Sequence, residues 1–157
     1  MSVRELGALV SAGLGKRLKP HGFTRRGARL SREQEHYIEH YAVSGTRWNS
    51  GTVPWDFSID VGVFFHGIPA REGAKGLWRH SHAIGSTEWI VEGSPPCFFV
   101  APETVEAIAD EVAKIILASS ESLPGIVSPA YARAKHGWTS PLPVPSNWNI
   151  PALESEG

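Results

Sequence analysis

Residues 55–65 constrain the fold of this chain more than any other segment. Their apolar side chains occupy every second position: Trp55, Phe57, Ile59, Val61, Val63 and Phe65. Six apolar residues at a period of two predict a strand with one face buried against a core. The opposite face begins with Asp56, Ser58 and Asp60, and this alternation is typical of the more solvated side of an antiparallel sheet.

Other segments predict a sheet around this strand. Residues 28–33 and 36–43 are expected to form two short strands, and residues 77–84 and 88–91 a fourth and a fifth. Residues 44–54 are rich in turn-forming residues and predict a loop.

Two long helices are predicted on either side of the strands. Residues 2–19 carry an apolar stripe at three- and four-residue steps, and Pro20 and Gly22 follow it. Residues 102–121 repeat this pattern with acidic residues on the outer side, which favours a helix that begins at Pro102. A short third helix is expected between Ser128 and Gly137, with the serine as its cap.

These elements indicate the α+β class. We expect an antiparallel sheet of four to five strands with the two long helices packed on one face. A chain of 157 residues fits one domain. We place this domain at residues 1–137, followed by a proline-rich extended tail at residues 138–157.

The composition narrows the cellular setting. Cys97 is the single cysteine, so no internal disulfide can form, which fits a reducing compartment. No apolar run reaches the ~20 residues of a membrane span. The N-terminal residues lack the pattern of a secretory signal. The sequence therefore predicts a cytoplasmic protein that does not interact with a membrane.

Charge is divided unevenly along the chain. Residues 1–32 hold eight basic residues and one acid, for a balance of +7, and residues 33–157 have a balance of −8. The basic segment 16–32 could bind an anion or a nucleic acid. It could equally lie against the acidic helix 102–121 and be neutralised there. Because no recognised nucleic-acid-binding motif accompanies the charges, nucleic acid is not an expected partner.

A family resemblance covers about the first hundred residues. The stretches LKPHGFTRRGARLSRE, SGTRWNSG and WDFSIDVGVF resemble a family of small, mostly bacterial proteins known as domain of unknown function 4304. The region around LWRHSHAIG and Trp89 is similar to that family's fourth strand, whereas Leu30 stands where the family has an aromatic residue. The resemblance implies an α+β fold and no established chemistry. Its pattern falls on Gly22, Phe23, Arg25, Arg26, Arg32, Ser44, Phe57, Ile59, Gly62 and Val63.

Histidines suggest one possible chemistry. His80 and His82 are two apart on a predicted strand, so their side chains would point to one face roughly 6–7 Å apart. With Asp60 they could serve a small metal-assisted or acid–base hydrolase. No cysteine motif or helical histidine motif supports a metal, so no cofactor, metal ligand or catalytic residue is assigned.

The loop after residue 43 suggests recognition instead. Arginine and tryptophan dominate binding hot spots, and Arg47 and Trp48 lie there beside flexible residues. Asp60 sits mid-strand, where aspartate is disfavoured, and Arg32 or a histidine could pair with it. The expected ligand-binding residues are Arg32, Ser44, Arg47, Trp48, Asp60, His80, His82 and Trp89.

The sequence thus favours a non-catalytic binding module. The free face of the sheet and the adjacent loops would hold a small molecule or a protein. The hydrolase and the anion-binding segment 16–32 stay as alternatives. Trp138 and Trp148 in the tail also suggest a homodimer, since exposed tryptophans often mark contact surfaces.

Overall fold

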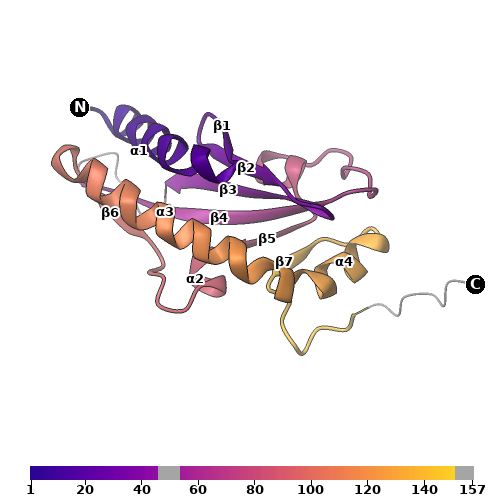
Figure 1. Ribbon diagram of the computed structural model, residues 1–157. Coiled ribbons are helices and arrows are strands. Elements are labelled where there is room, and N and C mark those ends of the chain that lie inside the picture. Colours follow the sequence, from indigo (N-terminus) through magenta and orange to yellow (C-terminus); the bar gives the residue numbers. More distant parts are fainter. Residues whose placement is uncertain (46–53, 151–157) are drawn as a thin grey trace, which may run out of the picture.

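The computed structural model describes residues 1–45 and 54–150 (Figure 1). Its α-helices are α1 (Val3–Leu18), α2 (Thr87–Ile90), α3 (Val105–Ser122) and α4 (Val127–Lys135). Short 3-10 helices are η1 (Lys19–His21), η2 (Gly76–His80), η3 (Pro102–Thr104) and η4 (Leu123–Gly125). The strands are β1 (Thr24–Arg26), β2 (Arg29–Glu33), β3 (Tyr37–Gly45), β4 (Trp55–Phe65), β5 (Ala83–Ser86), β6 (Phe98–Val100) and β7 (Ser140–Leu142).

The strands form one mixed sheet in the order β1-β2-β3-β4-β5-β7. The long strand β4 pairs with β6 near its start and with β5 near its end. The described pairs are antiparallel except β5 with β7, which is parallel. The expected α+β class is confirmed. The expected purely antiparallel sheet of four to five strands is wrong: among the described residues the sheet has seven strands, and the parallel pairing of β5 with β7 makes it mixed.

Helices α1 and α3 lie side by side across one face of the sheet (Figure 1). We call this the helix face. Four residues of the stripe predicted in α1 are fully buried: Leu6, Val10, Leu14 and Leu18. Val3 at its start is partly buried, and Leu9, expected alongside the stripe, is 43% exposed. The Ser2 hydroxyl caps the helix by accepting a hydrogen bond from the backbone N–H of Glu5, and Gly22 follows with a positive φ of 90°.

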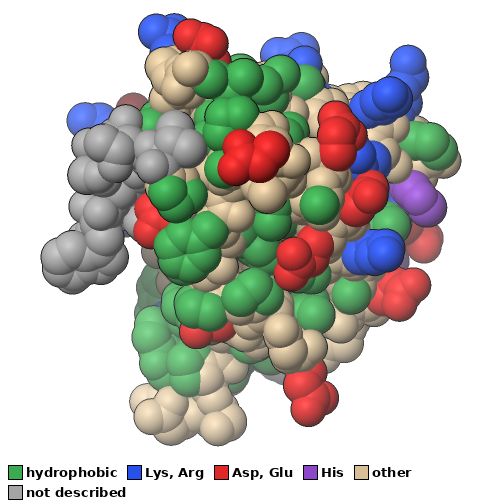
Figure 2. Space-filling model, turned by 90° about the vertical axis from the view of Figure 1, so that its left-hand side faces the viewer, with side chains coloured by type: hydrophobic (Ala, Val, Ile, Leu, Met, Phe, Trp, Pro, Cys, Tyr) green, Lys and Arg blue, Asp and Glu red, His purple; other side chains and the backbone are tan. Residues whose placement is uncertain are grey.

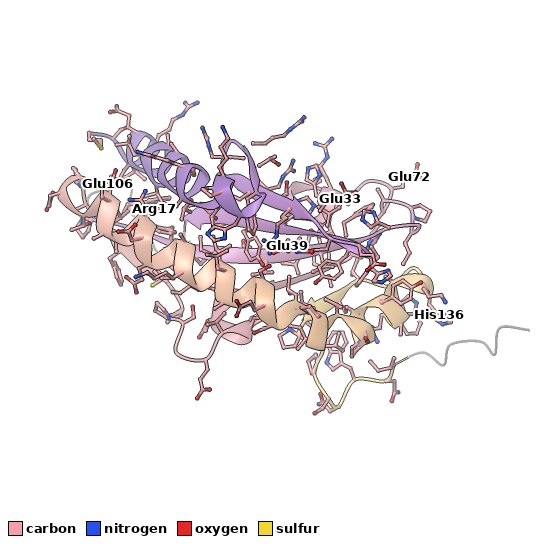
Figure 3. The ribbon with its side chains drawn as sticks, in the orientation of Figure 1. Arg17, Glu33, Glu39, Glu72, Glu106 and His136 are labelled. Carbon is pink, nitrogen blue, oxygen red and sulfur yellow. The ribbon has the colours of Figure 1, made fainter. Side chains whose placement is uncertain are left out.

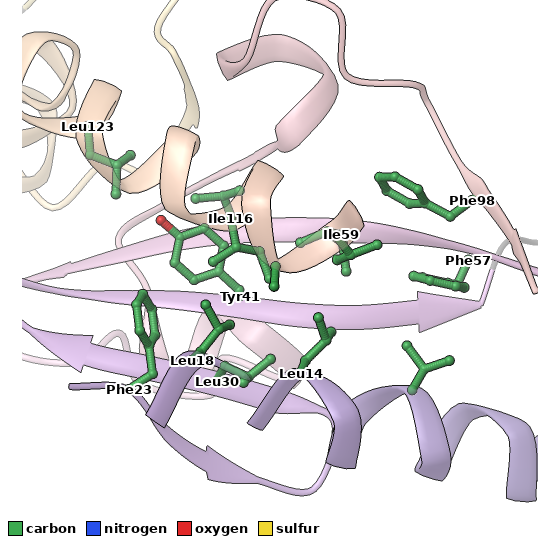
Figure 4. Packing of buried hydrophobic residues seen from close by; sticks show 14 of the residues in the cluster. Leu14, Leu18, Phe23, Leu30, Tyr41, Phe57, Ile59, Phe98, Ile116 and Leu123 are labelled. Atoms are coloured by element: carbon green, nitrogen blue, oxygen red, sulfur yellow. The ribbon is translucent and has the colours of Figure 1, made fainter. Parts of the chain in front are cut away.

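The core fills the space between these helices and the sheet (Figure 4). Leu14 from α1 and Ile116 from α3 point toward Ile59 on β4, and Phe57 stacks on Phe98 of β6. Burying an aliphatic or aromatic side chain of this size contributes about 1.5–3 kcal/mol. The alternation read in residues 55–65 therefore positions the whole helix layer.

The other face of the sheet, which we call the open face, is partly covered by η2. A side chain at Gly62 would come within 2.1 Å of the Ser81 hydroxyl oxygen, so only glycine lets this segment approach β4. The backbone N–H of Trp78 bonds to the carbonyl of Lys75 instead of to another strand. The predicted strand 77–84 is therefore wrong: its first part is η2, and β5 begins at Ala83.

The structure bears on three further expectations. Residues 88–91, expected as a strand, lie mostly in the short helix α2. Residues 138–150, expected as an extended tail, contribute β7, whose approach to β5 leaves no room for a side chain at Gly85. The third helix is present as α4, but Ser128 lies inside it and does not cap it.

The end of the molecule where α1 and α3 begin carries acidic side chains scattered among hydrophobic ones (Figure 2). Among the described residues, no helix has the length and apolar character needed to cross a membrane.

Candidate functional site

A groove of about 520 Å³ opens on the open face beside β4 and β5. Ser58 and Asp60 of β4 lie on its floor side, and three indoles from different elements line it: Trp78 of η2, Trp89 of α2 and Trp148 beyond β7. Ligand sites of this size are usually lined by aromatic side chains with a few polar groups. We call this site the tryptophan groove, and Glu88 also lines it.

Asp60 of the groove contacts Ser44, an expected site residue on the neighbouring strand β3 that does not itself line the groove. The Ser44 hydroxyl donates a hydrogen bond of 2.8 Å to Oδ2 of Asp60. Ser44 lies diagonally from Asp60 in the antiparallel register, two residues beyond its direct partner Ala42. The serine therefore orients a half-buried carboxylate toward the groove side of the sheet.

Trp89 is the third expected residue that belongs here. Its side chain is 58% exposed on the short helix α2. The Ser86 hydroxyl caps this helix by accepting a hydrogen bond from the N–H of Glu88. This cap fixes Glu88 and Trp89 at the groove wall.

Trp148 forms another wall and is held from the side of α4. The guanidinium of Arg133 lies 4.8 Å from the Trp148 ring centre and 5.0 Å from that of Trp138. It also donates a hydrogen bond to the carbonyl of Asn149. The two tail tryptophans are thus organised by one arginine, and Trp148 remains 41% exposed.

Arg32 lies elsewhere, on the helix face. It contacts the carboxylate of Glu39, which is fully buried between β3 and α3 (Figure 3). It also donates to the His21 carbonyl and the Ser120 hydroxyl, and its guanidinium lies 4.5 Å from the centre of the Phe23 ring. The suggested pairing of Arg32 with Asp60 is therefore wrong, because the two side chains project from opposite faces of the sheet.

The buried Glu39 carboxylate is fully occupied. The Tyr41 hydroxyl donates to Oε1 at 2.8 Å, and Gln34 Nε2 donates to Oε2 at 2.6 Å. Burial first, and then the neighbouring Glu39 charge, raise the pKa of Tyr41 well above its ordinary value, so the phenol keeps its proton. We call Arg32, Gln34, Glu39 and Tyr41 the Glu39 network and assign it a structural role.

His82 is held by backbone groups. Its Nδ1 accepts a hydrogen bond from the N–H of Phe65, and its Nε2 lies 3.0 Å from the carbonyl oxygen of Pro69. Its ring also stacks on Phe64 at 4.3 Å between centres. Both ring nitrogens therefore contact backbone groups, one at the end of β4 and one in the loop that follows it.

His80 projects into a different environment. It ends η2, and its ring centre lies 5.7 Å from that of His40 on β3. It lines a basic pocket and does not line the tryptophan groove that contains Asp60. The structure does not bring His80, His82 and Asp60 together, and the described residues contain no cluster of three or more His, Cys, Asp or Glu able to hold a metal ion.

Arg47 and Trp48, the centre of the expected recognition loop, lie outside the described residues. Trp78, Glu88 and Trp148 are aromatic or charged residues of the groove that were not among the expected site residues. The signal that could have found the two indoles is the number of tryptophans: the sequence has six, and tryptophan is rarely fully buried, so several were bound to reach the surface.

The basic segment 16–32 is divided between several environments. Arg17 pairs with Glu106 at 2.5 Å and Asp110 at 2.6 Å on α3, so neutralisation by the acidic helix is realised at this residue (Figure 3). The hydrogen bonds to Glu106 and then to Asp110 raise the pKa of Arg17, and the hydrogen bond from Arg17 lowers the pKa of Asp110. Arg26 and Arg29 instead reach the open-face side.

Comparisons with known proteins gave no match: no family model fits the chain, and neither a curated protein nor a solved structure is similar to it. The resemblance to domain of unknown function 4304 therefore stays a prediction.

Proposed function

We propose that this protein is a non-catalytic binding module that holds a small organic cation in the tryptophan groove. The observation that carries the proposal is the combination of three indoles and two carboxylates around one open cavity on the sheet. Among the described residues that line the groove, Asp60 and Glu88 are acidic and none is basic. Arg133 does not line it, but its guanidinium lies 4.8 Å from the ring centre of Trp148.

Aromatic rings and carboxylates favour the same class of ligand. The face of an indole attracts a cation within about 6 Å of the ring centre, and this contact contributes about 0.5–2 kcal/mol. A carboxylate nearby adds Coulombic attraction, which is stronger beside a partly buried sheet than in bulk water. A ligand with a quaternary or primary ammonium group and an apolar body satisfies both conditions.

The position of the groove also supports binding. Its walls come from η2, α2 and the segment after β7, whereas its floor is the rigid strand β4. Binding residues are commonly placed on connecting segments that a scaffold positions. The Ser44 hydrogen bond to Asp60 holds one charged group ready before a ligand arrives.

The hydrolase alternative has less support. It needed His80, His82 and Asp60 in one pocket, and His82 instead contacts backbone groups on both sides of its ring.

A fluorescence titration tests the proposal. Choline and its uncharged carbon analogue, 3,3-dimethyl-1-butanol, differ in the cationic nitrogen and share nearly the same shape. We expect choline to quench the tryptophan emission and to bind at least about tenfold more tightly than the alcohol. Trp89→Ala and Asp60→Asn should each weaken choline binding about tenfold.

The matched control is Phe99→Ala, which removes an aromatic ring that is 60% exposed but does not line the groove. This variant should bind choline as the wild type does. Equal affinity for choline and the alcohol would contradict the proposal, and so would unchanged choline binding in Trp89→Ala.

A further inference from the structure

A second pocket, of about 280 Å³, lies on the other side of η2. The β1–β2 hairpin contributes Arg26 and Arg29, and η2 contributes Arg79 and His80. Ala42 of β3 lies between them. Residues about fifty positions apart in the sequence are thus gathered into one basic cluster, which we call the arginine pocket.

The arginines of the pocket form no ion pair within the described part of the chain. None of the residues that line it is acidic. In the described part of the chain, the arginines that form ion pairs are Arg17 and Arg32, and neither belongs to the pocket. Like charges held close together repel each other, and a bound anion relieves this repulsion.

Two polar atoms at this place lack a hydrogen-bond partner in the structure. Nε of Arg29 and Nδ1 of His40 are both buried, and His40 is only 6% exposed. A buried donor or acceptor without a partner costs about 1–3 kcal/mol, so such groups are rare in folded proteins. The described residues contain six such atoms, and two of them, on Arg29 and on the adjoining His40, lie together beside the arginine cluster. This coincidence with the positive charges favours an anion at this place.

The electrostatics agree with this geometry. Burial and then the charges of Arg29, Arg79 and Arg26 lower the pKa of His80. Burial, Arg29 and His80 lower the pKa of His40 to about 4. Both imidazoles are therefore neutral near pH 7, where they avoid adding to the repulsion between the arginines.

We propose that the arginine pocket binds the phosphate group of a small ligand. A guanidinium presents paired N–H donors that match a phosphate, and several of them suit a dianion better than the single charge of a carboxylate. This inference does not depend on the tryptophan groove, which has different lining residues and the opposite charge.

Calorimetric titration with inorganic phosphate and with acetate, at equal ionic strength, tests the inference. Phosphate should bind at least about tenfold more tightly than acetate. Arg29→Met should weaken phosphate binding at least about tenfold, because it removes the charge and keeps the apolar stem. Arg79→Met should also weaken phosphate binding. Because Arg79 is exposed on η2, this substitution does not disturb the packing of the strands.

Arg25→Met is the matched control. Arg25 lies beside Arg26 on β1 but projects toward Gly15 of α1, and it bonds to the Gly27 carbonyl. The control should bind phosphate as the wild type does. Equal losses in Arg25→Met and Arg29→Met would overturn the inference, because they would show a general charge effect. Equal affinity for phosphate and acetate would overturn it as well.

A short single-stranded oligonucleotide serves as the second ligand. The protein should bind the oligonucleotide, at equal concentration of phosphate groups, no more tightly than it binds inorganic phosphate. Much tighter oligonucleotide binding with a steep dependence on salt would overturn the small-ligand inference in favour of a nucleic acid.

Discussion

Arg29 and Arg32 lie three residues apart on β2 and have opposite surroundings. Arg32 faces the helix layer, where it contacts a buried carboxylate, a carbonyl and a hydroxyl. Arg29 faces the open side, where its Nε is buried without a partner beside two further arginines. The alternation of side chains along a strand puts the same residue type into a structural role on one face and into a candidate binding role on the other.

The comparison separates two uses of buried polar groups. In the Glu39 network, the described donors and acceptors satisfy one another, as a stable interior requires. In the arginine pocket, the charges repel, and one polar atom of Arg29 and one of the adjoining His40 lack partners. A group that is costly to keep unsatisfied is a better indicator of a ligand than a group that is merely charged.

The largest expected effect tests this difference in stability. Arg32→Met should lower the free energy of unfolding by about 3 kcal/mol, since it leaves the Glu39 carboxylate buried without its cation. Arg29→Met should not lower it and should raise it by up to about 1–3 kcal/mol, because it removes a buried donor that has no partner. Urea unfolding of both variants measures the two values. Equal losses would show that the two arginines do not differ.

The next effect concerns pH. The pKa of His40 in the folded state is lowered to about 4, whereas in the unfolded chain it is ~6.5. Between these two values the unfolded chain binds a proton that the folded protein does not, so the stability decreases as the pH is lowered. By pH 4.5 this residue alone should cost about 2.5 kcal/mol relative to neutral pH. His40→Gln should flatten the loss over this range in urea unfolding. If wild type and His40→Gln lose stability equally as the pH is lowered, a group other than His40 is responsible for the loss.

The smallest effect concerns Arg17, which is paired as Arg32 is but with exposed partners. Its contacts to Glu106 and Asp110 lie at the surface, where water and salt screen them. Arg17→Met should destabilise the protein less than Arg32→Met does, and its effect should shrink as NaCl is raised. A loss that equals that of Arg32→Met and is insensitive to salt would contradict the distinction between surface and buried pairs.

Much of the fold could be predicted because its long elements have clear periods. The strand at residues 55–65 has the bounds expected from alternation, and both long helices appear where their apolar stripes lie. Strands β1, β6 and β7 have three residues each, which is too short for a period to show. Segment 77–84 was misjudged because its geometry depends on Gly62, a residue on another strand.

The candidate site could be predicted only in part. Ser44, Asp60 and Trp89 were expected, and the first two are joined by a hydrogen bond while Trp89 and Asp60 line one groove. Arg32 was expected on the open face with Asp60. It lies two residues from the buried Leu30 on β2, and this spacing already places both side chains on the helix face. Glu39 likewise shares its face with Tyr37 and Tyr41, so an acid within an apolar row was the visible sign of the Glu39 network. The arginine pocket could not be predicted, because it forms only where η2 packs beside the β1–β2 hairpin, and no local sequence pattern indicates that packing.

One measurement compares the two arginines directly. Nuclear magnetic resonance of the arginine Nε–H groups can follow Arg29 and Arg32 in the same sample while phosphate is added at constant ionic strength. The account predicts that the Arg29 signal shifts and saturates, because its free donor gains an acceptor, while the Arg32 signal stays in place. An unmoved Arg29 signal, or equal shifts of both, would contradict it.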